Sequence, residues 1–137
     1  MVKIIMGLKG SGKTKRLVEM VRRAVDEDNG SVVCIEKEKN LTFDIPYQAR
    51  LVEAAAYDAG SYEFLKGLIC GLHAGNYDIT HFFIDNFFKI VNDRSVEAMT
   101  AFVEWLSRFS EAEKVNFVIS MSMDPAGVPE SFREYLI

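Results

Sequence analysis

The sequence predicts an α/β protein: a three-layer α/β/α sandwich with a mostly parallel β-sheet. Three observations predict this class. Several short segments are apolar throughout, as expected of strands that are buried on both faces. Segments with a helical spacing of apolar residues lie between them, which is typical of parallel strands joined by crossover helices. The 137 residues, 49% of them hydrophobic, predict a single domain over 1–137, without a linker, repeat or low-complexity tract.

The elements predicted in the first half are a strand at 2–6, a helix at 13–27, a strand at 31–36 and a short strand at 50–52. Leu17 and Val21 share one face of the predicted helix, which closes at the turn 26–30. The second strand is rich in β-branched residues and too short for a helix. After Glu38 the chain is irregular, and Pro46 argues against a central strand there.

The elements predicted in the second half are a helix at 61–74, a strand at 80–85, a helix at 95–112, a strand at 115–120 and a short helix from near Pro129. Each long helix carries large apolar residues on one face, such as Leu65 with Ile69 and Phe102 with Leu106. Right-handed crossovers would bring the loops that follow the strands together at one edge of the sheet. Ligands bind at this edge in open parallel sheets.

Residues 7–14 read Gly-Leu-Lys-Gly-Ser-Gly-Lys-Thr and lie between the first predicted strand and the first predicted helix. In a loop placed there, successive backbone N–H groups and the positive helix end can face a polyphosphate. Lys13 would reach the β- and γ-phosphate oxygens, and the Thr14 hydroxyl would ligate Mg²⁺. The alternative is a glycine-rich turn that binds nothing. The predicted nucleotide-binding residues are Gly7, Leu8, Lys9, Gly10, Ser11, Gly12, Lys13, Thr14 and Lys15.

Asp85 ends the apolar run 80–85, much as the glycine-rich loop follows the first strand. An acid in this place would face the Mg²⁺ held by Thr14, usually through water, because Mg²⁺ keeps most of its hydration shell. The alternative is an aspartate that caps a turn together with Asn86. The predicted metal ligands are therefore Thr14 and Asp85.

Together these segments resemble the P-loop NTPase superfamily. GLKGSGKT is similar to its Walker A motif, and HFFID at 81–85 is similar to its Walker B motif. The resemblance extends from residue 1 to about residue 122 and implies the P-loop NTPase fold, with ATP and Mg²⁺ as ligands. Resemblance to GTPases would require an Asn/Thr-Lys-x-Asp segment to read guanine, and the sequence contains none, so ATP is expected.

The sequence departs from the family pattern after the Walker B aspartate. Many members carry a catalytic Glu there, whereas this chain has Asn86, which cannot take a proton from water. RecA-like ATPases carry their Glu at the end of the strand after the first helix, and Glu38 matches that place. It would activate the attacking water, or it would belong to an exposed loop of alternating charge. Ser120 is similar to the polar sensor residue of such folds, or it closes a turn. The predicted catalytic residues are Lys13, Glu38 and Ser120.

Three functions follow from this resemblance. The first is a small, slow ATPase or ATP-dependent switch that acts through a protein partner or self-association, as RecA-like proteins do. The second is a nucleotide sensor that does not hydrolyse ATP and signals to a partner. The third is a small-molecule kinase, because the order of elements also resembles type II thymidine kinases. Those enzymes carry a carboxylate after the Walker B Asp and a zinc ribbon, and this sequence has neither.

The composition limits the kinds of binding partner that we expect. A net charge of −4 argues against broad binding to nucleic acid, which requires a basic surface. No apolar stretch reaches the length of a membrane span, and the chain begins with a predicted strand rather than a signal peptide, so we expect a cytoplasmic protein without membrane contact. Cys34 and Cys70 both have apolar neighbours and are expected to be reduced, buried packing residues.

Overall fold

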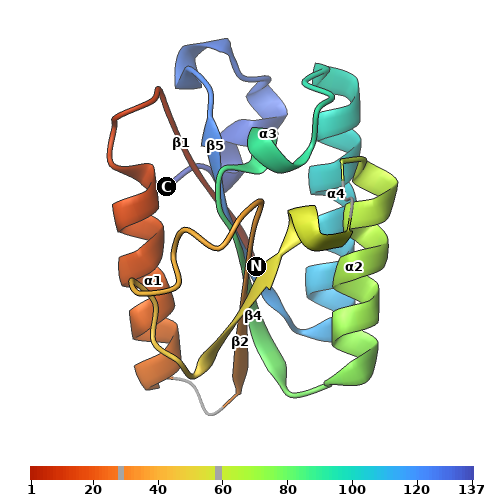
Figure 1. Cartoon of the computed structure of the whole chain (residues 1–137). Helices are drawn as coiled ribbons and strands as arrows, with labels where there is room; N and C mark the ends of the chain where they lie inside the picture. Colours follow the sequence, from red (N-terminus) through yellow and green to blue (C-terminus); the bar gives the residue numbers. More distant parts are fainter. Residues whose placement is uncertain (28–29, 58–59) are drawn as a thin grey trace.

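The computed structural model comprises residues 1–137 and describes residues 1–27, 30–57 and 60–137. Within these residues, five strands form one parallel sheet in the order β1-β5-β4-β2-β3 (Figure 1). The strands are β1 (Val2–Gly7), β2 (Ser31–Glu36), β3 (Ala49–Glu53), β4 (Ile79–Ile84) and β5 (Asn116–Ser122). Because β5 lies between β1 and β4, the two strands predicted to end in ligand-binding residues are not direct neighbours.

Helices cover both faces of the sheet, and this arrangement confirms the predicted three-layer α/β/α class. The helices are α1 (Lys13–Glu27), α2 (Tyr62–Gly75), the single turn α3 (Phe87–Ile90) and α4 (Val96–Glu113), with the 3₁₀ helices η1 (Ala54–Tyr57), η2 (Pro125–Gly127) and η3 (Glu130–Tyr135). In Figure 1, α1 packs on one side of the sheet while α2 and α4 pack on the other. The sheet is wholly parallel in the described part of the chain, where the sequence predicted a mostly parallel one.

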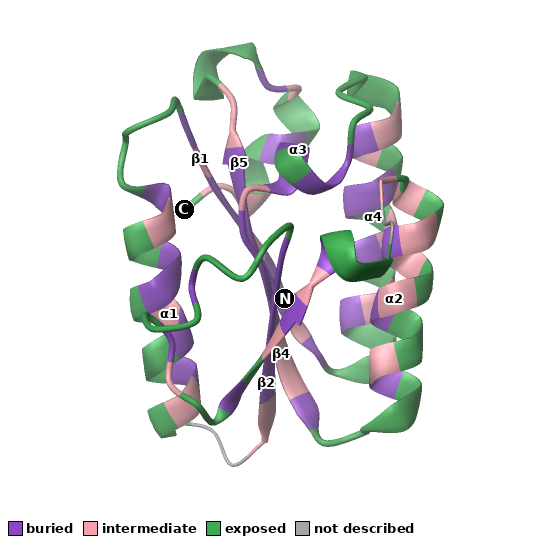
Figure 2. Ribbon diagram, in the orientation of Figure 1, coloured by how far each residue is buried: buried purple, intermediate pink, exposed green. Residues whose placement is uncertain are grey.

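The alternation of side chains along the buried strands divides the core into two clusters, one on each face (Figure 2). On the α1 face, Leu17 and Val21 pack against Cys34 and Phe83. The larger cluster, on the α2 and α4 face, includes the stacked rings of Phe82 and Phe117, whose centroids are 5.3 Å apart. Because both faces are apolar, the strands lack the polar alternation of a sheet that has one wet face.

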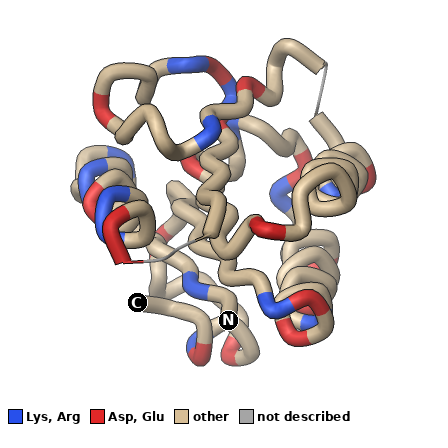
Figure 3. The backbone as a smooth tube through the Cα atoms, turned by 90° about the horizontal axis from the view of Figure 1, so that it is seen from below, with Lys and Arg blue, Asp and Glu red and all other residues tan. Residues whose placement is uncertain are grey.

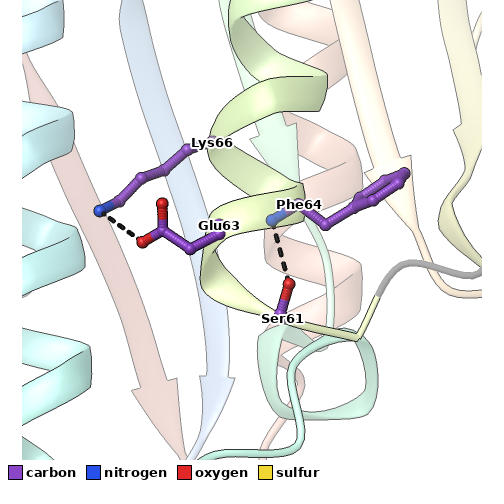
Figure 4. A network of polar contacts seen from close by, with 4 residues as sticks. All are labelled: Ser61, Glu63, Phe64 and Lys66. Atoms are coloured by element: carbon purple, nitrogen blue, oxygen red, sulfur yellow. Dashed lines mark hydrogen bonds and ion pairs between the residues drawn. The ribbon is translucent and has the colours of Figure 1, made fainter.

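Local sequence signals explain the helix ends. Ser61 precedes α2, and its side-chain oxygen accepts a hydrogen bond of 3.0 Å from the backbone N–H of Phe64 (Figure 4). One turn along, Lys66 Nζ lies 3.4 Å from Glu63 Oε1, the same-face spacing of i and i+3. Ser95 caps α4 in the same way, by accepting from the N–H of Ala98.

The predicted elements are largely present, with changes at their ends. The short strand expected at 50–52 is the edge strand β3, and the C-terminal helix is the 3₁₀ helix η3. The strand expected at 115–120 begins one residue later and continues to Ser122, so Ser120 lies inside β5 rather than at its end. The turn predicted at 26–30 includes residues 28–29, which lie outside the described residues. The sequence did not predict α3.

The prediction for the two cysteines was right for Cys34 and wrong for Cys70. Cys34 is fully buried in β2, whereas Cys70 is exposed on α2. Its neighbour Ile69 is buried in the core, and one residue turns a helix by about 100°, so Cys70 faces away from the sheet. Burial raises the pKa of the Cys34 thiol, and the negative charges of Asp85 and Glu36 raise it further.

These environments predict different reactivity, because the thiolate is the reactive form of cysteine. At pH 8, a thiol-specific maleimide should modify one thiol in the native protein and both after denaturation. Mass spectrometry of the labelled protein, with Cys70→Ser as the control, measures this. The native Cys70→Ser variant should take up no label; uptake at the native rate would contradict the burial of Cys34.

In the residues that the structure describes, no helix combines the length and the apolar character needed to cross a membrane. Viewed from the end where the strands begin, acidic and basic residues are interspersed along the helices and loops (Figure 3).

Candidate nucleotide-binding site

A tight loop, residues 8–12, connects the end of β1 to the start of α1. Gly10 and Gly12 both have φ of +84°, a left-handed conformation that side chains with a Cβ rarely adopt. The N–H of Ser11 donates to the carbonyl of Leu8 at 3.1 Å, and the N–H of Arg16 donates to the carbonyl of Gly12 at 3.1 Å. The glycine positions of the sequence therefore supply the backbone angles that fold the loop against the first turn of α1.

Lys13 is the first residue of α1, and its side chain returns over the loop. Its Nζ donates to the carbonyl of Leu8 at 2.9 Å and lies 3.5 Å from Ser11 Oγ. Only 7% of Lys13 is exposed. Both of these partners are neutral oxygens, and no carboxylate in the described part of the chain forms an ion pair with Lys13. A buried cation without an acidic partner is costly unless an anion joins it.

Asp85 lies directly after β4 and is the centre of a buried polar cluster. The Ser120 hydroxyl donates to Asp85 Oδ1 at 2.6 Å, and Thr14 Oγ1 is 3.3 Å from both carboxylate oxygens. Asn86 Nδ2 is 3.2 Å from Asp85 Oδ2, and the Asn86 N–H donates to Ser120 Oγ at 2.8 Å. Ser120 is fully buried, and 2% of Asp85 is exposed. Thr14 therefore links the start of α1 to the end of β4, while Ser120 holds Asp85 from β5, the strand between β1 and β4.

A cavity of about 410 Å³ opens beside the loop and this cluster. Its size falls within the usual range for small-molecule sites. Five cationic side chains line it, and no carboxylate is among the lining residues that the structure describes. The lining residues are Lys9, Gly10, Gly12, Lys13, Thr14, Lys15, Asn86, Phe88, Lys89, Arg94 and Ser122. A concave site of one charge raises the local concentration of a ligand of opposite charge, so the cavity is suited to an anion.

Thr14 and Asp85 form an oxygen donor set that fits Mg²⁺. A hydroxyl and a carboxylate, 3.3 Å apart, provide the few protein ligands that this ion takes while it keeps several waters. In the described residues, no group of three or more His, Cys, Asp or Glu could hold a metal. The arrangement therefore suits an ion shared with a ligand rather than a metal held by protein alone.

The structure brings together most of the predicted site residues, but not Glu38. β2 ends at Glu36, and Glu38 is exposed in the following loop and does not line the cavity. Glu36 is the buried acid: its carboxylate accepts the N–H groups of Asn40 and Leu41 at 2.8 and 3.0 Å. Burial raises the pKa of Glu36; the two backbone hydrogen bonds oppose this shift, and the charge of Asp85 adds to it.

Ser120 is placed differently from the sensor role that the sequence predicts for it. It bonds Asp85 from inside β5, and Ser122, two residues further along the same strand, lines the cavity instead. Leu8 and Lys9 are exposed at the outer part of the loop, and Lys15 is exposed on α1. Of the predicted nucleotide-binding residues, Lys9, Gly10, Gly12, Lys13, Thr14 and Lys15 line the cavity.

Besides Asn86, four lining residues were absent from the site that the sequence predicted: Phe88, Lys89, Arg94 and Ser122. Three of them follow β4 within ten residues of Asp85. The sequence contained a signal for them, because the segment that follows a parallel strand begins at the ligand-binding edge of the sheet. The segment that follows β4 contains two cations, Lys89 and Arg94.

Comparison of the chain with models of known protein families, and with curated proteins, returned no match.

Proposed function

We propose that this protein binds ATP with Mg²⁺ and acts as a slow ATPase or as an ATP-dependent switch. The observation that carries the proposal is the cationic cavity beside the 8–12 loop. Five positive side chains line it without a carboxylate, and buried Lys13 lies among them. The resemblance of GLKGSGKT and HFFID to the Walker A and Walker B motifs indicates that the anion is a nucleoside polyphosphate.

Each residue then has a definite task. The backbone N–H groups of the 8–12 loop and the first turn of α1 bind phosphate oxygens, aided by the helix dipole. Lys13 exchanges its bond to the Leu8 carbonyl for phosphate oxygens. Thr14 and Asp85 hold Mg²⁺ together with its waters; when bound, the ion neutralises phosphate charge. Ser120 fixes the rotamer of Asp85 through its 2.6 Å hydrogen bond.

The cavity also supports slow turnover rather than fast turnover. Rapid hydrolysis needs a residue that orients and activates water, and no carboxylate is found among the described lining residues. Asn86 occupies the position after Asp85, and its side chain bonds the Asp85 carboxylate. A nucleotide sensor that does not hydrolyse ATP is the second candidate, and the same observation favours it.

Lys13→Ala tests the proposal. ATP with Mg²⁺ at about 100 times the dissociation constant should stabilise the wild-type protein by ~2.7 kcal/mol, and the variant should lose this increment. Thermal unfolding with and without nucleotide measures it. Lys66→Ala, which removes a half-buried lysine from α2, the helix on the other side of the sheet from α1, is the matched control and should keep the full increment. Equal increments in wild type and Lys13→Ala would refute the site.

A single-turnover assay separates the two candidates. Trace-labelled ATP is mixed with excess protein, and bound nucleotide and released phosphate are followed together. Phosphate release that disappears in Lys13→Ala indicates an ATPase. Tight binding without cleavage over hours indicates the sensor.

A further inference from the structure

Two cations of the cavity come from outside the glycine-rich loop. Lys89 and Arg94 belong to the segment 86–94, which begins directly after Asp85 and lines the same cavity as Lys9 and Lys13. The resemblance to Walker motifs assigns no role to this segment.

Both cations are available to a ligand. Lys89 and Arg94 are exposed, and neither has an ion-pair partner in the described part of the chain. Asp93, the acid next to Arg94 in the sequence, accepts the N–H of Ser95 through Oδ1 at 2.8 Å and forms no ion pair with Arg94 in the described residues. Both cations line the cavity, and no carboxylate is among its described lining residues.

Arg94 is also held in place. Its guanidinium carbon lies 5.0 Å from the centroid of the Phe88 ring, a cation–π contact. Phe88 is itself 7% exposed and lines the cavity, so the ring is a fixed support. An arginine positioned in advance loses less side-chain entropy when it binds an anion.

The segment 86–94 is anchored at both ends of its course. Phe87 is fully buried and contacts the rings of Tyr62 and Phe102. The Tyr62 hydroxyl donates to the carbonyl of Asp93 at 2.8 Å, and the N–H of Asn92 donates to the carbonyl of Gly60 at 3.3 Å. The segment thus connects the cavity wall directly to the start of α2.

The place of the terminal phosphate follows from the metal site. Mg²⁺ in nucleotide sites bridges the β- and γ-phosphates. Thr14 and Asp85 would hold this ion, and the segment 86–94 starts directly after Asp85, so a γ-phosphoryl group bound to the ion would be near that segment. A diphosphate would bind at the 8–12 loop, and the added phosphoryl group of a triphosphate would be the part within reach of the segment 86–94.

From these observations, and on the premise of the proposed function, we propose that Lys89 and Arg94 bind the terminal phosphoryl group of the triphosphate. The segment 86–94 thereby distinguishes ATP from ADP and passes this difference to α2 through Tyr62.

The experiment compares affinities for ADP and for the hydrolysis-resistant analogue adenylyl imidodiphosphate, each with Mg²⁺, by isothermal titration calorimetry. In Lys89→Gln/Arg94→Gln, affinity for the triphosphate analogue should fall at least tenfold, while affinity for ADP should change by less than twofold. The control Lys66→Gln/Arg108→Gln removes the same charge from α2 and α4 and should change neither. Phe88→Leu, which removes the ring below Arg94, should weaken triphosphate binding alone.

Three results would overturn the inference while leaving the nucleotide site intact. An equal loss of affinity for both nucleotides would mean that the two cations only attract anions in general. Unchanged affinity for both nucleotides would show that neither residue belongs to the site. The variant could also keep its triphosphate affinity while its ADP-loaded form loses the ability to bind inorganic phosphate. That result would assign the segment 86–94 to a second phosphorylated molecule. Failure of the proposed function is distinct: the wild-type protein would then bind neither nucleotide.

Discussion

Asp85→Asn is expected to make the nucleotide-free protein more stable, by about 1 kcal/mol, and to abolish the dependence of nucleotide binding on Mg²⁺. Asp85 is a carboxylate with 2% exposure, and its hydrogen-bond donors are the neutral side chains of Ser120, Thr14 and Asn86. A second buried carboxylate, Glu36, ends the neighbouring strand β2, and the charge of Asp85 contributes to the raised pKa of Glu36. The buried charge is thus costly until a cation joins it.

The asparagine keeps the shape of the side chain and the acceptor for Ser120. Thr14 can turn its hydroxyl, and Asn86 can flip its side-chain amide, so that both accept from the new amide. Urea unfolding without nucleotide measures the gain in free energy of unfolding, and titrations with Mg²⁺ or with EDTA measure the metal dependence. Wild-type affinity should rise at least tenfold with Mg²⁺, and Asp85→Asn should show no rise. Glu104→Gln removes one charge from the exposed face of α4 and should behave as wild type. A variant that is less stable and still responds to Mg²⁺ would contradict the role of Asp85.

Phe87→Ala is expected to lower the free energy of unfolding by about 3–5 kcal/mol, a large part of the stability of a small domain. Phe87 is fully buried, and its ring lies 5.7, 5.2 and 5.5 Å, between centroids, from those of Tyr62, Phe88 and Phe102. Truncation leaves a cavity below α3 and removes the support of the cavity wall. Phe87→Leu, which retains most of the volume, should lose much less stability and keep nucleotide binding.

Phe43 offers a matched control because it is the same residue type with 97% exposure. Phe43→Ala should change the free energy of unfolding by less than about 0.5 kcal/mol. Denaturant unfolding of the three variants, with equal slopes, makes the comparison. A cost for Phe87→Ala no greater than that for Phe43→Ala would show that α3 is not anchored by this ring.

Much of the fold could be predicted from the sequence because the strands are apolar throughout and the helices carry one apolar face. The single turn α3 could not be, since Phe87 and Phe88 continue the apolar character of β4 and four residues are too few to show a helical period. Its start depends on Asn86, which adopts a left-handed conformation with φ of 50° and bonds Ser120 from the neighbouring strand. Only the pairing of β4 with β5 creates that contact.

The sequence likewise predicted only some residues of the candidate site. Gly10, Gly12, Lys13 and Thr14 are local in sequence, so their arrangement could be read from one segment. Glu38 could not be placed, because the end of β2 is set by Glu36, whose carboxylate turns back to the N–H groups of the next loop. Lys89 and Arg94 reach the cavity only through the buried rings that fix their segment, and those contacts are tertiary.

The position of β5 between β1 and β4 has a consequence for movement. The chain leaves β1 toward the face covered by α1, and it leaves β4 toward the face covered by α4, so the two walls of the cavity diverge above β5. A strand order that reverses in this way leaves a crevice without any gap in the sheet. A nucleotide held there would touch both outer layers at once. Its release would then remove contacts to both helical layers, while the hydrogen bonds between β1, β5 and β4 would be kept.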